Sequence, residues 1–227
     1  MTKLVETQEQ TNYCLVTMDD GKANALSFDM LAQLNAALDA AEQSGKLVII
    51  CGRTGKFSAG FDLSIMGQGG DAMLDLLREG AGLSRRLLNF PAPVILAVSG
   101  HALAMGALLL LSADYRIGVR GNYKIGLNEV AIGMTLPYFG VELARARLAS
   151  AHLDKAVGLA QIYAADGAVA AGYLDEAVEE GDLLSRAVDA AEQLAGLNME
   201  AHQNTKSRVR AELNAALDAA FEKELGV

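Results

Sequence analysis

Apolar residues in the first part of the chain follow two alternating patterns. Short continuous apolar runs at Tyr13–Met18, Leu47–Cys51 and Val94–Ser99 are typical of buried strands. Between these runs, apolar residues recur at helical spacing over Phe28–Ala41 and again over Met73–Leu88. Because strands alternate with helices in this way, we predict an α/β fold.

The pattern changes in the second part of the chain. Ala104–Ala113 is apolar all round, which is typical of a fully buried helix. Tyr115–Val119 and Tyr123–Gly126 predict two short strands on either side of a turn, and nearly everything beyond them has helical spacing. We therefore expect an α/β core over residues 1–140 and a helical region over residues 141–227.

The last amphipathic stretch places several apolar side chains on one stripe. Within Met199–Leu225, the residues Leu213, Leu217 and Phe221 recur at helical spacing. A stripe of this kind needs a surface to cover it, and we expect that surface to belong to another copy of the chain.

Composition and charge narrow the classes of partner. The formal net charge of −9 argues against non-specific nucleic-acid binding, which needs clustered cations. The two cysteines, Cys14 and Cys51, lie in apolar runs away from metal-ligand spacing, so we interpret them as buried and reduced. The longest apolar run is too short for a bilayer, and the first residues lack the pattern of a signal peptide. We expect a cytoplasmic protein with no membrane segment.

A first place that could carry chemistry lies at Phe57–Leu63. Gly60 follows a strand and the predicted loop Gly52–Gly60, which also carries the cations Arg53 and Lys56. Glycine permits a positive φ or the close approach of a ligand to the backbone. The alternative is an ordinary turn.

A second place lies at Ser99–Gly106, where a strand ends, Gly100 turns the chain and an apolar helix begins. The first N–H groups of a helix have no internal partner and point outward at the positive end of the dipole, so they suit a developing negative charge on oxygen. The alternative is a core helix with small residues for close packing. His101 lies beside the turn, where a packed or surface histidine is commoner than a catalytic base.

A third place lies at Ile125–Val130, where Glu129 stands in a mostly apolar segment. A buried glutamate is rare unless it is paired or functional. Burial would raise its pKa towards the range of an effective general base. The alternative is a surface glutamate on a loop.

These three places, in this order, resemble the crotonase (enoyl-CoA hydratase/isomerase) superfamily. The resemblance also includes Lys22–Ser27, the strand entry Ser112–Arg116 and the segment Ala165–Glu176. It implies a spiral of strand–strand–helix repeats with C-terminal helices that form trimers, sometimes paired into hexamers. It also implies an acyl-CoA substrate and no metal or redox cofactor.

Carried over residue by residue, the resemblance assigns two backbone N–H groups, those of Phe61 and Met105, to the thioester oxygen. It assigns the role of acid and base to Glu129. The residues expected to contact the substrate, with the nucleotide end of coenzyme A near the first five, are Lys22, Ala23, Ala25, Arg53, Lys56, Ala59, Gly60, Asp62, Leu63 and Leu108. We expect Ser64–Leu77 to shape the acyl pocket.

Two departures from the family pattern bear on the reaction. Hydratases of this family use two glutamates; the first falls here on Leu108 and the second on Glu129. The position of the additional aspartate of dienoyl-CoA isomerases is Pro137. The segment Tyr123–Phe139 most resembles Δ3,Δ2-enoyl-CoA isomerases, which keep one glutamate. The alternatives are a hydratase, a thioesterase, a decarboxylase that uses Tyr138, and a non-catalytic acyl-CoA-binding paralogue.

Overall fold

The computed structural model describes residues 2–226, whose strands form two sheets. The larger sheet has the strand order β1-β2-β3-β5-β7-β9, and the smaller has the order β4-β6-β8. All neighbouring strands pair in parallel except β1 and β2. The strands are β1 (Val5–Glu9), β2 (Tyr13–Met18), β3 (Leu47–Gly52), β4 (Gly55–Ser58), β5 (Val94–Val98), β6 (Gly100–Leu103), β7 (Tyr115–Val119), β8 (Ile125–Gly126) and β9 (Glu176–Val178).

Helices connect the strands and then make up most of the last third of the described chain. They are α1 (Phe28–Gln43), α2 (Leu63–Met66), α3 (Gly70–Asn89), α4 (Met105–Ser112), α5 (Tyr138–Arg147), α6 (Ser150–Val157), α7 (Ala165–Ala171), α8 (Leu183–Ala195), α9 (Met199–Val209) and α10 (Ala211–Leu225). Two 3₁₀ turns, η1 (Val130–Ile132) and η2 (Glu180–Asp182), complete the elements.

The chain winds as a spiral in which each pass places one strand in each sheet. The pairs β3/β4, β5/β6 and β7/β8 have their first member in the larger sheet and their second in the smaller one, and a helix follows each pair. Successive passes stack because β3, β5 and β7 are neighbours, as are β4, β6 and β8. The predicted strand–strand–helix spiral is confirmed.

The change of sheet between β5 and β6 depends on Gly100. A side-chain Cβ at this position would lie 2.0 Å from the carbonyl carbon of Gly55, in the neighbouring strand β4. Only glycine lets the two backbones approach this closely. The sequence predicted a turn here, and the structure instead begins strand β6 at Gly100.

Other elements also differ from the prediction. The predicted loop Gly52–Gly60 contains β4, and the strands Val5–Glu9 and Glu176–Val178 were not predicted. The predicted strand Tyr123–Gly126 is reduced to β8, and it pairs with β6 rather than with the preceding strand. Strands of two to five residues leave too little hydrophobic periodicity to be recognised.

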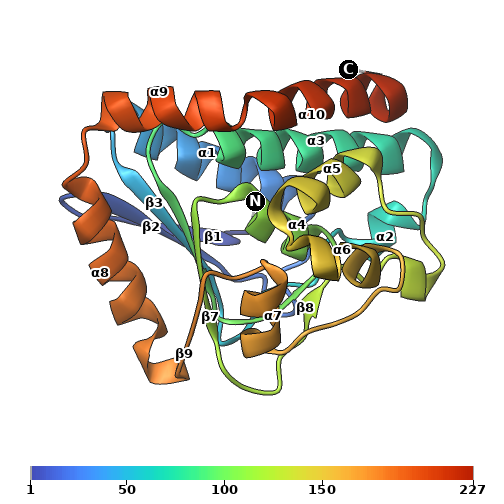
Figure 1. Cartoon of the computed structure of the whole chain (residues 1–227), viewed down its shortest axis with the longest axis horizontal. Coiled ribbons are helices and arrows are strands. Elements are labelled where there is room, and N and C mark those ends of the chain that lie inside the picture. Colours follow the sequence, from blue (N-terminus) through green and yellow to red (C-terminus); the bar gives the residue numbers. More distant parts are fainter. Residues whose placement is uncertain (1, 227) are drawn as a thin grey trace.

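The C-terminal helices pack on the rest of the same chain. Helix α8 lies against β3, β5 and β7, and α10 lies against α5 and α3. Figure 1 shows α9 and α10 running along the top of the molecule, with α10 beside α3. The stripe that carries Leu217 and Phe221 is therefore buried within its own chain, with 1% and 6% of these residues exposed. No helix within residues 2–226 is long and apolar enough to cross a membrane.

Candidate active site

The three candidate segments converge on one cavity. Its volume is about 160 Å³, and it lies where α2, α3 and α4 meet the segment that follows β8. The residues that line it are Ala59, Phe61, Leu63, Met66, Leu77, Ala104, Met105, Leu108, Asn128, Glu129, Ile132, Met134, Pro137 and Phe139. A mostly apolar cavity with few polar groups is typical of a small-molecule site.

Gly60 brings the first two segments into contact. Its φ is +93°, and a Cβ at this position would lie 2.8 Å from Ala104 Cβ and 3.2 Å from Met105 N. Only a residue without a side chain fits there. The backbone N–H groups that follow this contact, those of Phe61 and Met105, donate no hydrogen bond to another residue in the described part of the chain. Two such donors side by side suit an oxygen that gains negative charge.

Ala104 holds a backbone conformation that residues other than glycine rarely adopt. Its φ is +51° and its ψ is −126°, and it is the N-cap of α4. The Ala104 carbonyl accepts hydrogen bonds from Ala107 N and Leu108 N, which begins the helix. Strained backbone of this kind persists only where the surrounding structure holds it in place. The conformation of Ala104 in turn sets the orientation of the peptide plane that carries the Met105 N–H.

Glu129 is a buried residue of the cavity wall, directly before η1. Only 7% of the residue is exposed, and its Oε2 atom has no hydrogen-bond partner within residues 2–226. Burial raises the pKa of this carboxyl above its ordinary value, because the charged form loses hydration. A buried carboxylate on a cavity wall, with one oxygen unpartnered, is a candidate general base.

Leu108 lies one helical turn beyond Met105 and is 1% exposed. Residues three apart on a helix share a face, so Leu108 and Met105 line the same cavity. Its apolar side chain offers no group to hold a water molecule. Among the described residues that line the cavity, Glu129 is the one with an ionisable side chain.

The loop before α1 is joined to the first candidate segment by hydrogen bonds. Asn24 is fully buried, and its Nδ2 donates to Met18 O, Lys56 O and Phe57 O at 3.0–3.1 Å. Ala59 N donates to Ala23 O at 3.0 Å, and Leu26 N donates to Gly60 O at 2.8 Å.

The cations of these two segments lie near one another. Arg53 Nη1 donates to Lys22 O at 2.8 Å, and Arg53 Nε lies 3.7 Å from Asp19 Oδ1. Lys22 is exposed, whereas Lys56 and Arg53 are half-buried. Lys56 N donates to Arg53 O at 2.9 Å, so the three cations stand on neighbouring backbone, and none of them lines the cavity.

The structure brings together only some of the predicted site residues. Phe61, Met105, Glu129, Leu108, Ala59 and Leu63 line one cavity, with Gly60 at its edge. Met66 and Leu77 also line it, and both belong to the segment expected to shape an acyl pocket.

Two polar residues of the candidate segments face other partners. Asp62 Oδ1 accepts from Ser64 Oγ at 2.6 Å and caps α2 by accepting from Ser64 N at 2.8 Å. The hydroxyl bond, and after it the backbone bond, lowers the pKa of the Asp62 carboxyl. His101 does not line the cavity. Its Nδ1 accepts from Lys124 N at 2.9 Å, and burial together with Lys56 and Lys124 lowers its pKa.

Several lining residues were not singled out from the sequence. Asn128 adjoins Glu129, and its Oδ1 is buried without a partner within residues 2–226. Ile132 and Met134 line the cavity from the segment between β8 and α5, and Phe139 lines it from the first turn of α5. The sequence indicates their role only through their nearness to Glu129. Spacing alone does not distinguish an apolar residue of a cavity wall from one of the core.

Comparisons with known proteins agree with this geometry. Residues 8–227 match the family model described as enoyl-CoA hydratase/isomerase. The chain is 27% identical to human mitochondrial enoyl-CoA delta isomerase 1, covering 91% of this chain and 70% of that protein. It is 31% identical to a probable enoyl-CoA hydratase of Rhizobium meliloti, covering 99% of this chain and 88% of that one.

A solved structure of the same family is similar to this chain over nearly its whole length. The crystal structure of an enoyl-CoA hydratase/isomerase family protein from Pseudomonas syringae superimposes with a TM-score of 0.96 at 45% identity, covering 98% of this chain and 97% of that one. The fold, the site and these relatives lead to one conclusion: the chain belongs to the enoyl-CoA hydratase/isomerase family of the crotonase superfamily.

Proposed function

We propose that the protein is a Δ3,Δ2-enoyl-CoA isomerase in which Glu129 is the single acid and base. The observation that supports this most directly is the lining of the cavity, where Glu129 alone among the described residues is ionisable. Its burial and its unpartnered Oε2 suit a carboxylate that takes up and returns a proton.

The chemistry follows from this arrangement. The Phe61 and Met105 N–H groups bind the thioester oxygen, most strongly when it becomes an enolate. The Glu129 carboxylate removes a proton from C2, and the electrons of that C–H bond move into the dienolate. The protonated Glu129 then delivers the same proton to C4, which leaves the double bond between C2 and C3. Losing one such N–H donor typically raises the barrier by about 3 kcal/mol.

Hydration is less well supported by this site, because it also needs a held and activated water. Leu108 occupies the position where a second carboxylate would serve that purpose, and the surrounding residues Met105 and Ala107 are apolar. The relatives include an enoyl-CoA delta isomerase and a probable enoyl-CoA hydratase. The absence of a second carboxylate in the lining is what favours isomerisation here.

The remaining proposals concern binding and assembly. The cations Lys22, Arg53 and Lys56 would receive the nucleotide end of coenzyme A, together with the backbone of Ala23 and Ala25. We retain a homotrimer, or a pair of trimers, as a proposal that light scattering tests. Its support is the family resemblance, since the stripe of α10 is buried within the chain. We propose that no cofactor besides the substrate takes part.

The decisive experiment compares two reactions on one preparation. Formation of the conjugated thioester from a 3-enoyl-CoA is followed by its ultraviolet absorbance, and loss of that absorbance follows hydration of a 2-enoyl-CoA. We expect isomerisation to be faster by a large factor. Calorimetry with a non-reactive acyl-CoA serves as the binding control. Efficient hydration with slow isomerisation would overturn the proposal, and failure to bind any acyl-CoA would overturn the substrate class.

A further inference from the structure

Gly80 is a buried residue in the middle of α3, on the same helix face as Leu77, which lines the cavity of Glu129. Glycine inside a helix is less favourable than alanine, because it loses more backbone freedom on folding. The φ of Gly80 is not positive, so the backbone itself would accept an alanine. The need for glycine here therefore comes from the neighbouring side chains.

Two side chains of the candidate site pack against Gly80. A Cβ at this position would lie closer than 3.0 Å to both Cε1 and Cζ of Phe61, and 3.4 Å from Met105 Cε. Phe61 and Met105 line the cavity, whereas Gly80 does not. The Phe61 ring therefore stands between Gly80 and the cavity, and glycine leaves the space that the far end of the ring occupies.

The backbone of Phe61 is held separately from its ring. Leu26 N donates to Gly60 O at 2.8 Å, and Asp62 N donates to Leu26 O at 3.2 Å, so both neighbours of Phe61 are bonded to one buried residue. A group added at Gly80 would meet the end of the ring, which turns about side-chain torsions more easily than these backbone bonds break. The ring would then move away from α3 and into the cavity.

The cavity is small enough for one displaced ring to change what it holds. A cavity of about 150 Å³ lined by leucine, isoleucine and phenylalanine binds one benzene molecule, so the volume of about 160 Å³ found here has room for about six carbon atoms. Leu77, Leu108 and Phe139 of its wall belong to the buried core, and close packing there resists their displacement.

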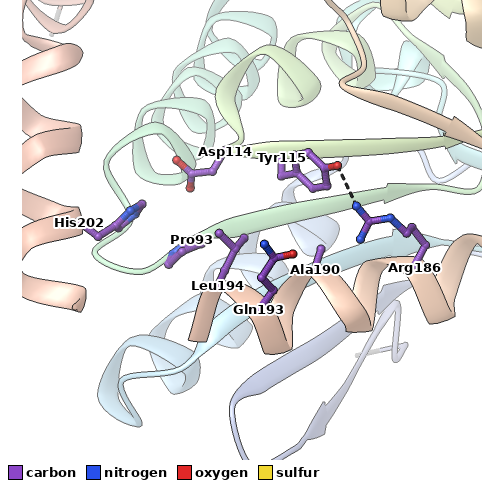
Figure 2. A pocket seen from close by; sticks show the side chains of 8 residues that line it. All are labelled: Pro93, Asp114, Tyr115, Arg186, Ala190, Gln193, Leu194 and His202. Carbon is purple, nitrogen blue, oxygen red and sulfur yellow. Dashed lines mark hydrogen bonds between the residues drawn. The ribbon is translucent and has the colours of Figure 1, made fainter. Parts of the chain in front are cut away.

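A larger cavity, of about 530 Å³, lies beside α8 and is shown in Figure 2. In its wall Arg186 Nη2 donates to the Tyr115 hydroxyl at 3.2 Å, and Asp114 Oδ2 lies 2.7 Å from Lys206 Nζ. Glu129 does not line this cavity. Its paired polar groups give an apolar tail little to bind, so we expect the acyl tail in the smaller cavity.

We propose that Gly80 determines the length of the acyl group that the site accepts, up to about six carbons, because it leaves space for the Phe61 ring outside the cavity. Gly80 acts through Phe61, so it is a positioning residue that does not itself touch the substrate. The inference rests on the acyl-CoA substrate of the proposed function, but not on the choice between isomerisation and hydration.

Calorimetry with butanoyl-, hexanoyl- and octanoyl-CoA tests the proposal. These saturated thioesters lack the double bond, so binding is measured without either reaction. In the wild type, we expect affinity to rise about fourfold for each CH₂ that is buried, up to hexanoyl-CoA, and to rise little beyond it. Gly80→Ala should weaken hexanoyl-CoA by about fourfold or more, the loss of at least one buried CH₂, and weaken butanoyl-CoA less. With substrates the loss should lie in KM rather than in kcat.

Gly82→Ala is the matched control in the same helix. A Cβ at Gly82 would meet no atom within 4 Å, so alanine should raise Tm by about 2–4 °C and leave the dependence on chain length as in the wild type.

Phe61→Leu provides the rescue, because leucine keeps the backbone N–H but lacks Cε1 and Cζ. Alone it should extend tight binding to octanoyl-CoA, and combined with Gly80→Ala it should restore most of the affinity for hexanoyl-CoA. A general loss of stability at Gly80 would not be restored in this way. The inference is overturned if Gly80→Ala keeps the wild-type dependence on chain length, or if Phe61→Leu does not restore hexanoyl-CoA binding.

Two further outcomes separate this inference from the proposed function. Should Gly80→Ala fail to fold, an unchanged affinity of Phe61→Leu for octanoyl-CoA would overturn the inference. A wild type that binds these thioesters with the expected limit, but does not isomerise a 3-enoyl-CoA, would overturn the proposed reaction and leave the role of Gly80 standing. A wild type that binds none of them would overturn both.

Discussion

The Glu224 carboxylate near the end of α10 accepts a hydrogen bond from the backbone N–H of Tyr138, the first residue of α5, at 2.7 Å. No side chain caps α5 from its own N-cap, Pro137, so a carboxylate from a distant helix satisfies this N–H and meets the positive end of the helix dipole. Lys223 lies 3.8 Å from the Tyr138 ring centroid, and Phe139 packs edge-on against Phe221. Because Pro137 and Phe139 line the candidate active cavity, α10 supports one of its walls.

Removing this contact should loosen the cavity wall. Glu224→Leu should destabilise the protein by about 1 kcal/mol, the typical value of a helix cap, and raise KM for acyl-CoA more than it lowers kcat. Glu224→Gln, which keeps an acceptor oxygen, should recover most of both losses. Thermal unfolding and steady-state kinetics measure the two effects. Equal kinetic behaviour of the two variants and the wild type would mean that α10 does not position the wall.

Glu129→Gln should abolish most of the turnover. Glutamine keeps the size and polarity of the side chain but is not a base, so we expect at least a ~10²-fold loss of kcat, the low end for general acid–base catalysis. Affinity for a non-reactive acyl-CoA should change little, and calorimetry measures it. A variant with a near-normal rate would show that another group moves the proton, and Tyr138 would be the next residue to replace.

The pH dependences of kcat and of stability should both reflect the burial of Glu129. Because burial raises its pKa, the active carboxylate form, and with it kcat, should appear only above the ordinary pKa of a glutamate. The contribution of Glu129 to the free energy of unfolding changes with pH in the opposite direction to kcat. The folded state holds this proton more tightly than the unfolded state does, so the contribution of Glu129 to stability falls as pH rises from the unfolded to the folded pKa.

The same reasoning predicts how Glu129→Gln affects folding. The variant removes the cost of a buried charge, so it should be more stable than the wild type at pH 7 and lose this advantage below pH ~4. Denaturant unfolding at several pH values measures the difference. A variant that is less stable than the wild type at neutral pH would show that the Glu129 carboxylate makes a favourable interaction.

Leu108→Glu should shift the reaction towards hydration. The new carboxylate would share the helix face of Met105 and could hold a water opposite Glu129. We expect the ratio of hydration to isomerisation to rise, while stability falls by about 1–3 kcal/mol because the group is buried without partners. Leu108→Gln serves as the polar control, and circular dichroism checks folding. If the ratio of hydration to isomerisation were unchanged in a folded variant, Leu108 would not determine which reaction the site favours.

Gly60→Ala and Ala104→Gly form a reciprocal pair. An alanine Cβ at Gly60 would lie 2.8 Å from Ala104 Cβ and would displace the backbone beside Met105 N, so activity should fall by at least ~10²-fold. Glycine at position 104 should relax a φ of +51° and stabilise the protein by about 1 kcal/mol with activity retained. Thermal unfolding and the isomerase assay compare them. A stabilised, fully active Gly60→Ala variant would contradict the close contact.

The long apolar runs and the amphipathic spacing determined much of the fold in advance. Leu47–Gly52 and Val94–Val98 are strands of the larger sheet, as their continuous hydrophobicity predicts, and Ser27 caps α1 through its side chain. Gly60 and Glu129 were also recognisable, because a glycine after a strand and a lone carboxylate in an apolar segment are both unusual. These features are local, so the residues themselves carry the signal.

Only the tertiary structure decided how these pieces meet. Strands β4, β6 and β8 are too short to show periodicity, and their pairing joins residues far apart in the chain. The same holds for the α10 stripe, whose spacing predicts burial but does not reveal that α5 of its own chain covers it. The unpartnered Oε2 of Glu129 and the 3.2 Å approach of a Gly60 Cβ to Met105 N depend on that long-range packing. A sequence pattern predicts which side chains are buried, whereas only the tertiary structure determines which residues they contact.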